Sequence, residues 1–118
     1  MILVETSVWV GHLRKTDERL VMALDTGQVL AHPFVIGELA CGHLQRRAEL
    51  LGLLAALPAA PVASQAEVLG YIERHALAGR GIGFVDVHLL AATSLASDAT
   101  LWTRDKRLAA TAESLGIA

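Results

Sequence analysis

Four carboxylates of the chain lie at the ends of apolar segments or inside them. Glu5 follows the first apolar run, Asp105 follows the segment ATLWT, Asp86 comes shortly after the glycine-rich GRGIG, and Glu38 lies within FVIGELACG. Carboxylates gathered at one place repel one another unless a cation offsets their charge. Hard oxygen ligands of this kind suit Mg²⁺ or Mn²⁺. If the fold brings the acids together, the expected chemistry is metal-assisted hydrolysis.

Each acid taken alone also has a purely structural explanation. Asp86 or Asp105 could cap a helix or interact with its dipole. Glu38 is harder to explain in that way, because its apolar neighbours place it on or beside a buried face, where an unpaired carboxylate is costly. The four acids together therefore predict a site more strongly than any one of them.

The elements around the acids indicate how they would meet. Strands are expected at residues 1–4, 28–31 and 99–103, with a weaker signal at 61–63. Helical spacing predicts helices at residues 7–14, 17–27, 33–44, 64–78, 83–98 and 105–116. Ser64 and Glu67 form a capping box at the start of the fourth helix. Strands separated by helices favour parallel pairing in an α/β sandwich, whose polar sites gather at the carboxyl ends of the strands.

Composition limits the class of protein. At 118 residues the chain is expected to form one domain, residues 1–118, and its single cysteine, Cys41, excludes an intrachain disulfide and fits a reducing cytosol. No apolar run approaches the roughly 20 residues that cross a bilayer, and no secretory signal is visible, so a cytoplasmic location is expected. Cys41 is predicted to be a core residue.

A family resemblance rests on four segments taken in order. ILVETSVWV, FVIGELACG, GFVDVHLLAA and LWTRDKRL resemble the motif blocks of the PIN-domain ribonucleases, and specifically of the VapC toxins of toxin–antitoxin pairs. The resemblance implies a PIN-like fold, a three-layer α/β/α sandwich with a small, mostly parallel central sheet. It further implies an Mg²⁺- or Mn²⁺-dependent endoribonuclease that leaves 5′-phosphate and 3′-hydroxyl ends on its RNA substrate. The implied site residues are the metal ligands Glu5, Glu38, Asp86 and Asp105, and the hydroxyl of Thr103.

Partners are expected as well. The resemblance implies a VapB-like antitoxin, and the hydrophobic content of 53% predicts that a partner covers part of the surface, in a homodimer and in the antitoxin complex. Trp9 and Leu13, one helical turn apart, are the predicted apolar contact for either partner. Arg80, Arg104, Lys106 and Arg107 are candidates for contacts with RNA phosphates, or are ordinary surface bases.

Glu5 departs from the family pattern, in which the first acid is nearly always Asp. The added methylene moves the carboxylate by about 1 to 1.5 Å. Because Mg²⁺ tolerates little departure from octahedral geometry, this residue is expected to slow cleavage without affecting folding.

Two other functions compete with RNA cleavage. A catalytically silent PIN-like module would keep the antitoxin interface without turnover, and Glu5 is its main support. A phosphoacceptor receiver domain also has an acidic Mg²⁺ pocket, but it needs an Asp at the end of a central strand, which this chain lacks. Zinc is not expected, because the five histidines show no His-x-x-x-His pair, and His88 is predicted to be structural.

Overall fold

Three short parallel strands form one sheet in the order β2–β1–β3. The computed structural model describes residues 1–118 and places β1 at Ile2–Val4, β2 at Val29–Leu30 and β3 at Thr100–Trp102. The central strand, β1, pairs through Leu3 with Leu30 on one side and with Leu101 on the other. All three carboxyl ends therefore lie at the same edge of the sheet, as predicted.

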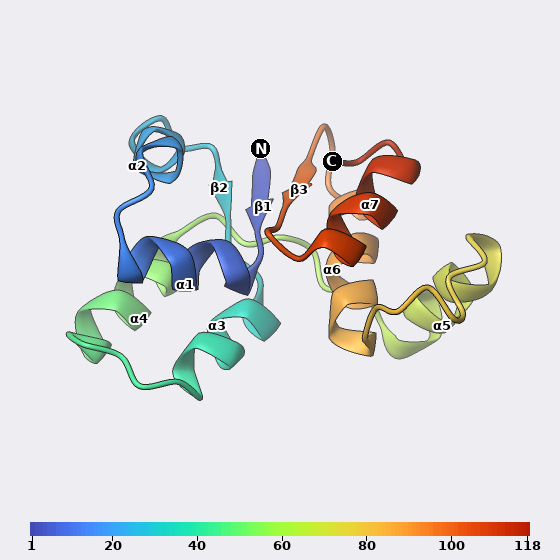
Figure 1. Ribbon diagram of the computed structural model, residues 1–118, viewed down its shortest axis with the longest axis horizontal. Coiled ribbons are helices and arrows are strands. Elements are labelled where there is room, and N and C mark those ends of the chain that lie inside the picture. The colour runs from blue at the N-terminus through green and yellow to red at the C-terminus, as the bar shows by residue number, and fades with distance from the viewer.

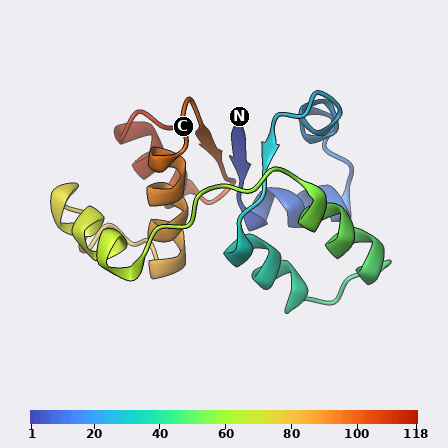
Figure 2. The ribbon, with the colours of Figure 1, turned by 180° about the vertical axis from the view of Figure 1, so that it is seen from behind.

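Seven helices surround the strands in two groups. Figure 1 shows α1 to α4 on one side of the strands and α5 to α7 on the other. Their bounds are α1 Thr6–Arg14, α2 Glu18–Asp25, α3 Pro33–Ala40, α4 Arg47–Ala56, α5 Gln65–Arg74, α6 Phe84–Leu95 and α7 Lys106–Ser114. Residues 57–64 cross behind the strands from one group to the other (Figure 2). The chain is thus an α/β sandwich of the predicted class.

The core is densest around β1 and α6. Leu3 and Val4 of β1 are fully buried, and α6 is buried at every position from Val87 to Thr93. A helix that is apolar all round has no solvent face over that stretch. Because α6 is packed in the core over this stretch, its first turn, which carries Asp86, is held in place against the sheet.

Several helices begin at residues that the sequence identifies. The capping box of Ser64 and Glu67 is present at the start of α5, and Asp17 caps α2 by accepting the backbone N–H groups of Arg19 and Leu20. Helix α3 begins at Pro33 after the N-cap His32, whose Nδ1 accepts the Phe34 N–H at 3.0 Å.

Some sequence predictions were wrong. Helix α4 was not predicted, residues 61–63 form no strand, and the helix predicted at 33–44 ends at Ala40. Cys41 is exposed rather than part of the core, because it lies past the end of α3. Trp9 is 2% exposed, so it packs in the core and cannot anchor a partner, whereas Leu13 is 46% exposed. No helix has the length and apolar character needed to span a membrane.

Candidate active site

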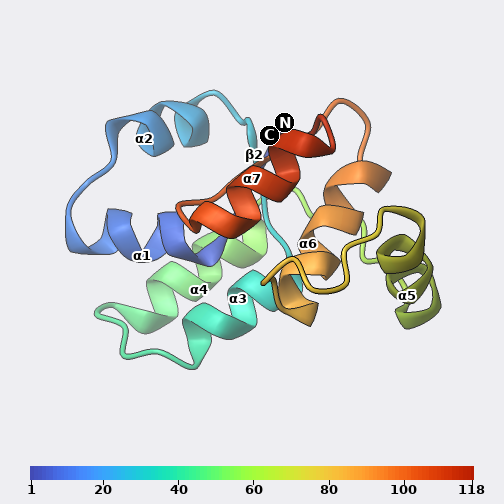
Figure 3. The same ribbon diagram turned by 45° about the vertical axis from the view of Figure 1, so that its right-hand side comes forward.

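The four acids lie at the carboxyl edge of the sheet, each on a different element. Glu5 joins β1 to α1, Glu38 lies near the end of α3, Asp86 is in the first turn of α6, and Asp105 is the N-cap of α7. Figure 3 shows the start of α7 beside α1, with α3 and α6 next to each other below them. Burial raises the pKa of Asp86, and the charges of Glu5, Asp105 and Glu38 raise it further, against the opposing hydrogen bond from Gly83. The fold therefore brings the four carboxylates close enough to repel one another.

Glu5 is held by two hydroxyl groups. Its Oε1 accepts hydrogen bonds from Ser7 Oγ at 2.5 Å and from Thr103 Oγ1 at 2.6 Å. Each hydroxyl in turn accepts a backbone N–H, Ser7 from Arg104 at 2.9 Å and Thr103 from Asp105 at 3.1 Å. Because each hydroxyl oxygen accepts a backbone N–H group, its own proton is donated to the carboxylate. The network occupies Oε1 and leaves Oε2 of Glu5 without a hydrogen bond.

Glu38 is held by a third hydroxyl. Thr6 Oγ1, in the first turn of α1, donates to Glu38 Oε1 at 2.6 Å. Glu38 is exposed beside the buried face of α3 formed by Val35 and Leu39, so its carboxylate is not itself buried. Hydrogen bonding by Thr6, and not rescue of a buried charge, accounts for its position. Here too only one carboxylate oxygen is used.

Asp86 and Asp105 are held by backbone instead. Asp86 Oδ2 accepts the Gly83 N–H at 3.1 Å, and Asp105 Oδ1 accepts the Leu108 N–H at 3.0 Å. Both bonds satisfy free N–H groups at the N-terminal ends of α6 and α7, where the helix dipole also favours negative charge. The structural explanation given for each acid is thus correct, and it does not exclude a role in the site.

The donor set has the chemistry that a divalent cation needs. It consists of four carboxylates, at least two of which keep an oxygen free of hydrogen bonds, and Mg²⁺ or Mn²⁺ prefers such hard oxygen ligands. No three His, Cys, Asp or Glu side chains are already arranged to hold one ion together. Glu38 and Asp105 are exposed, so their side chains have room to turn toward a common ion.

Two histidines are buried close to this region without full hydrogen bonding. His32 Nε2 and His88 Nδ1 have no partner, and burial lowers the pKa of His32 to about 4, with a smaller contribution from His88. Burial also lowers the pKa of His88. Both rings pack edge-to-face against Phe34, with centroid distances of 5.1 and 4.7 Å. The expected structural role of His88 fits this packing, although its ring is not fully satisfied.

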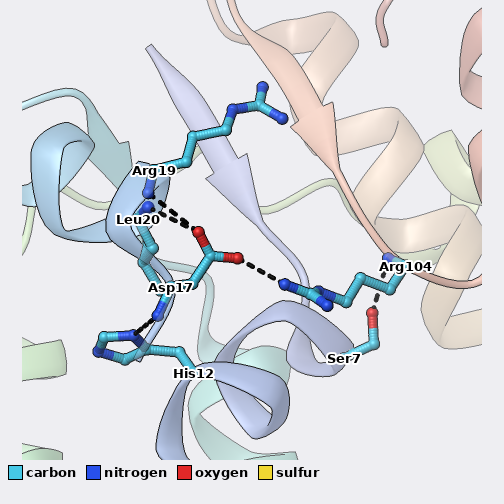
Figure 4. Close-up of polar contacts among 6 residues, drawn as sticks. All are labelled: Ser7, His12, Asp17, Arg19, Leu20 and Arg104. Carbon is cyan, nitrogen blue, oxygen red and sulfur yellow. Dashed lines mark hydrogen bonds and ion pairs between the residues drawn. The ribbon is translucent and has the colours of Figure 1, made fainter. Parts of the chain in front are cut away.

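Arg104 forms an ion pair with a residue outside the acidic site, the N-cap of α2. Its Nη2 forms an ion pair with Asp17 Oδ2 at 2.5 Å (Figure 4). Its guanidinium also lies against Gly11. Desolvation alone would raise the pKa of Asp17, but hydrogen bonds from Arg104 and from the backbone of Leu20 and Arg19 hold it below its usual value. The charge of Arg104 is therefore engaged within the protein, which makes it a weaker candidate for a phosphate contact.

Sequence reasoning identified Thr103 but missed the site contacts of Thr6 and Ser7. Both residues directly follow Glu5, a position at which a hydroxyl ordinarily indicates a helix N-cap. Neither serves as the cap, since the N-cap position of α1 is Glu5 itself. Two hydroxyls beside an acid at a strand end were the signal that could have been used.

Comparison with known proteins agrees with this arrangement. The family model described as "PIN domain" matches residues 2–114, a range that includes all four acids. Two curated relatives named "Ribonuclease VapC32", from the CDC 1551 / Oshkosh and ATCC 25618 / H37Rv strains of Mycobacterium tuberculosis, are each 49% identical over 118 residues. Each alignment covers 100% of this chain and 95% of the relative.

Proposed function

The chain belongs to the PIN-domain family, and from this premise we propose that it is the endoribonuclease toxin of a type II toxin–antitoxin pair. Its resemblance to VapC-type ribonucleases extends over its full length. The observation that carries the proposal is that Glu5, Glu38, Asp86 and Asp105 come from four different elements to the carboxyl edge of the sheet, within the range that matches the PIN domain. Clustered acids of this kind are typical of a metal-dependent nuclease site.

The side chains of the site would bind and orient a divalent ion for hydrolysis of an RNA phosphodiester. Glu5, Glu38, Asp86 and Asp105 would hold the ion, and Ser7 and Thr103 fix the orientation of Glu5. When bound, the ion lowers the pKa of a water molecule and offsets negative charge on the phosphodiester. We propose Mg²⁺ or Mn²⁺, because every candidate ligand is a carboxylate oxygen. The reaction would take place in the cytoplasm, with residues 1–118 acting as one PIN-like domain.

The protein partner of a VapC-type toxin is a VapB-type antitoxin. We propose that the antitoxin docks in a groove beside the acidic site. The groove has a volume of about 520 Å³ and lies between α1 and the end of α3, with Val10, Leu13 and Glu38 among its lining residues. Val10 and Leu13 are both more than 40% exposed. An apolar antitoxin segment would cover them and place a basic side chain near Glu38.

A homodimer is a second proposed association. Large apolar side chains remain exposed on several helices, which supports coverage by another copy of the chain: Met22, Leu53, Leu69, Phe84 and Leu95. Light scattering of the purified chain should give twice the mass of one chain. A monodisperse monomer at high concentration would contradict the dimer.

The alternative of a catalytically silent module is not favoured. Its main support is Glu5, yet Glu5 is held by Ser7 and Thr103 as a functional ligand would be. The curated relatives are also named ribonucleases over the same length.

Cleavage of RNA by the purified chain tests the proposal. Total RNA is incubated with Mg²⁺, with Mn²⁺ and with EDTA, and the product ends are identified by their response to phosphatase and ligase. We expect cleavage only with a divalent ion and 5′-phosphate ends. Asp86→Asn, which keeps the size of the side chain, is the control and should be inactive. Cleavage that persists in EDTA, or in this variant, would contradict a metal-dependent site.

A further inference from the structure

The four bases near the acids are not equivalent, which allows the structure to distinguish among them. Arg104 is paired with Asp17, and Arg80 Nη2 donates to Ser114 Oγ at 3.3 Å, near the far end of α7. Lys106 and Arg107 make no ion pair and donate no hydrogen bond. Of these two, only Arg107 has its charged group packed closely against the backbone.

That contact is with the backbone of Gly81. A Cβ atom at residue 81 would lie 2.8 Å from Nη1 and 2.9 Å from Cδ of Arg107. Such distances are far below carbon contact distance, so the arginine side chain lies directly over the glycine. Gly81 also has a φ of +77°, a conformation that side chains other than glycine adopt with strain. The side chain of Arg107 thus occupies space that exists only because residue 81 is glycine.

Both residues of this contact are close in sequence to an acid of the site or to its hydrogen-bond partner. Arg107 is two residues past Asp105, in the first turn of α7. Gly81 is two residues before Gly83, whose N–H binds Asp86 at 3.1 Å. Arg107 and Gly81 therefore bring the start of α7 next to the loop before α6, the elements that carry two of the four carboxylates. Arg107 has no ion-pair partner there.

An RNA-cleaving site needs such a charge, because the formal net charge of the protein is −2 and its substrate is a polyanion. We propose that Arg107 binds an RNA phosphate adjacent to the scissile one, and that Gly81 positions the guanidinium for that contact. The inference rests on the proposed ribonuclease function and deepens it. A guanidinium is suited to this task, since it offers a rigid fork of donors to phosphate oxygens.

The competing explanation is structural. Arg107 could serve only to hold the 77–83 loop against α7. In that case, removal of its charge would change the stability of the loop but not the number of phosphates that the protein neutralises. The dependence of RNA affinity on salt separates the two explanations, because each phosphate contact to single-stranded RNA contributes roughly 0.7 to the slope of log K against log salt.

The chain contains a matched control for Gly81. Gly79 has the same φ of +77°, but a Cβ atom there would meet nothing within 4 Å. Gly79→Ala and Gly81→Ala therefore introduce the same backbone strain, and only Gly81→Ala displaces Arg107. Arg107→Gln removes the charge and keeps most of the packing, and Arg80→Gln is the control for loss of a nearby charge.

Binding of a fluorescent single-stranded RNA is measured by anisotropy in EDTA over a range of salt concentrations, and cleavage is measured with Mg²⁺. We expect Arg107→Gln and Gly81→Ala each to weaken binding about tenfold, as loss of one charge-assisted hydrogen bond would. Arg107→Gln should also reduce the salt slope by roughly 0.7. Gly79→Ala and Arg80→Gln should stay close to the unaltered protein. Gly81→Ala should add no further loss in the Arg107→Gln background.

Equal effects of Gly79→Ala and Gly81→Ala, or a salt slope that Arg107→Gln leaves unchanged, would overturn the inference while leaving the proposed function intact. If Gly81→Ala fails to fold by circular dichroism, the salt slope of Arg107→Gln decides the question alone, because Arg107 is exposed and its replacement does not disturb the core. An unaltered protein that neither binds nor cuts RNA would overturn both the function and the inference.

Discussion

The two halves of the acidic site hold their carboxylates by different means. On the side of α1 and α3, Glu5 and Glu38 accept hydrogen bonds from side-chain hydroxyls, which belong to Thr6, Ser7 and Thr103. On the side of α6 and α7, Asp86 and Asp105 accept backbone N–H groups at the N-terminal ends of their own helices. Two of these hydroxyls, on Ser7 and Thr103, also accept backbone N–H groups from the segment between β3 and α7. The second pair also satisfies free backbone N–H groups at the N-terminal ends of two helices.

A substitution can therefore change catalysis without changing stability in one half of the site, whereas in the other half a substitution changes both. Replacement of Glu38 should affect catalysis alone, because it lies near the end of α3 and caps no helix. Replacement of an acid that caps its helix should also cost the free energy of the cap, typically about 1 kcal/mol. The predictions below test this contrast, beginning with the largest expected effect.

Removal of an acid from either half should reduce RNA cleavage at least about a hundredfold, as loss of a preorganised electrostatic group commonly does. Only Asp105→Ala should also lower the free energy of unfolding, by about 1 kcal/mol, whereas Glu38→Ala should leave it nearly unchanged. Cleavage rates and urea denaturation of the two variants are compared. Asp105→Asn is the control: an asparagine still caps the helix, so stability should return while activity does not. Equal losses of stability in Glu38→Ala and Asp105→Ala would contradict the contrast.

Loss of a hydroxyl partner of Glu5 should reduce metal affinity or activity by roughly ten- to a hundredfold. The reason is that Thr103 and Ser7 fix the orientation of this carboxylate through its Oε1. Thr103→Val and Ser7→Ala are measured in a Mn²⁺ titration by calorimetry and in the cleavage assay. Thr103→Ser restores the hydroxyl and should restore both readouts. Wild-type affinity in Thr103→Val would show that the network does not orient Glu5.

The helices also differ in what starts them: α7 begins on a site acid, and α3 begins on the neutral His32. The pKa of His32 is about 4 in the fold against 6.5 for an unperturbed histidine, so the unfolded chain takes up the proton first as the pH falls. The contribution of His32 is complete above that unperturbed pKa and decreases toward the folded one. Linkage then predicts a loss of about 2 kcal/mol by pH 5, or about thirtyfold in the unfolding equilibrium.

Urea denaturation at neutral pH and at pH about 5 measures this loss. His32→Asn keeps an acceptor at the N-cap but does not titrate, and all other ionisable groups, His88 among them, remain the same. The difference in pH dependence between the two proteins is therefore due to His32. Identical dependence would mean that its pKa is not lowered by burial.

The smallest expected effect is a gain. Glu5→Asp shortens the side chain by one methylene and should raise cleavage about tenfold at saturating Mg²⁺, if the carboxylate of Glu5 lies roughly 1 Å from its best position. The two proteins are compared across Mg²⁺ and Mn²⁺ titrations, with circular dichroism to confirm equal folding. Equal rates at every metal concentration would show that Glu5, held by Ser7 and Thr103, is a fully competent ligand.

The position of the acids could be predicted from the sequence because it depends on boundaries between elements. Glu5 and Asp105 follow apolar strands, and parallel strands place their carboxyl ends at one edge. The family resemblance implied a role for Thr103, but its hydrogen bond to Glu5 could not be derived from the sequence pattern alone, since the two residues lie 98 positions apart. Helix α4 lacks a side-chain cap, and its N-cap Arg46 has a φ of +50°, so its start carries no signal in the sequence.

Burial was harder to predict than helix position. Trp9 and Leu13 lie one turn apart on α1, yet Trp9 packs in the core and Leu13 is exposed beside the groove. A short helix with nine residues offers too few turns to define which face the rest of the fold covers. Which of two neighbouring apolar residues meets the core is decided by elements distant in sequence.

The pairing of β1 with β3 has a consequence for the timing of protein synthesis. At about 5 to 20 residues per second, the ribosome makes Glu5 several seconds before Thr103. Until Thr100–Trp102 docks beside Ile2–Val4, Glu5 lacks one of its two hydroxyl partners and Asp105 has not yet been made. The acidic site is therefore incomplete during most of translation. The nascent chain therefore lacks Asp105 and one of the two hydroxyl partners of Glu5 until its synthesis is almost finished.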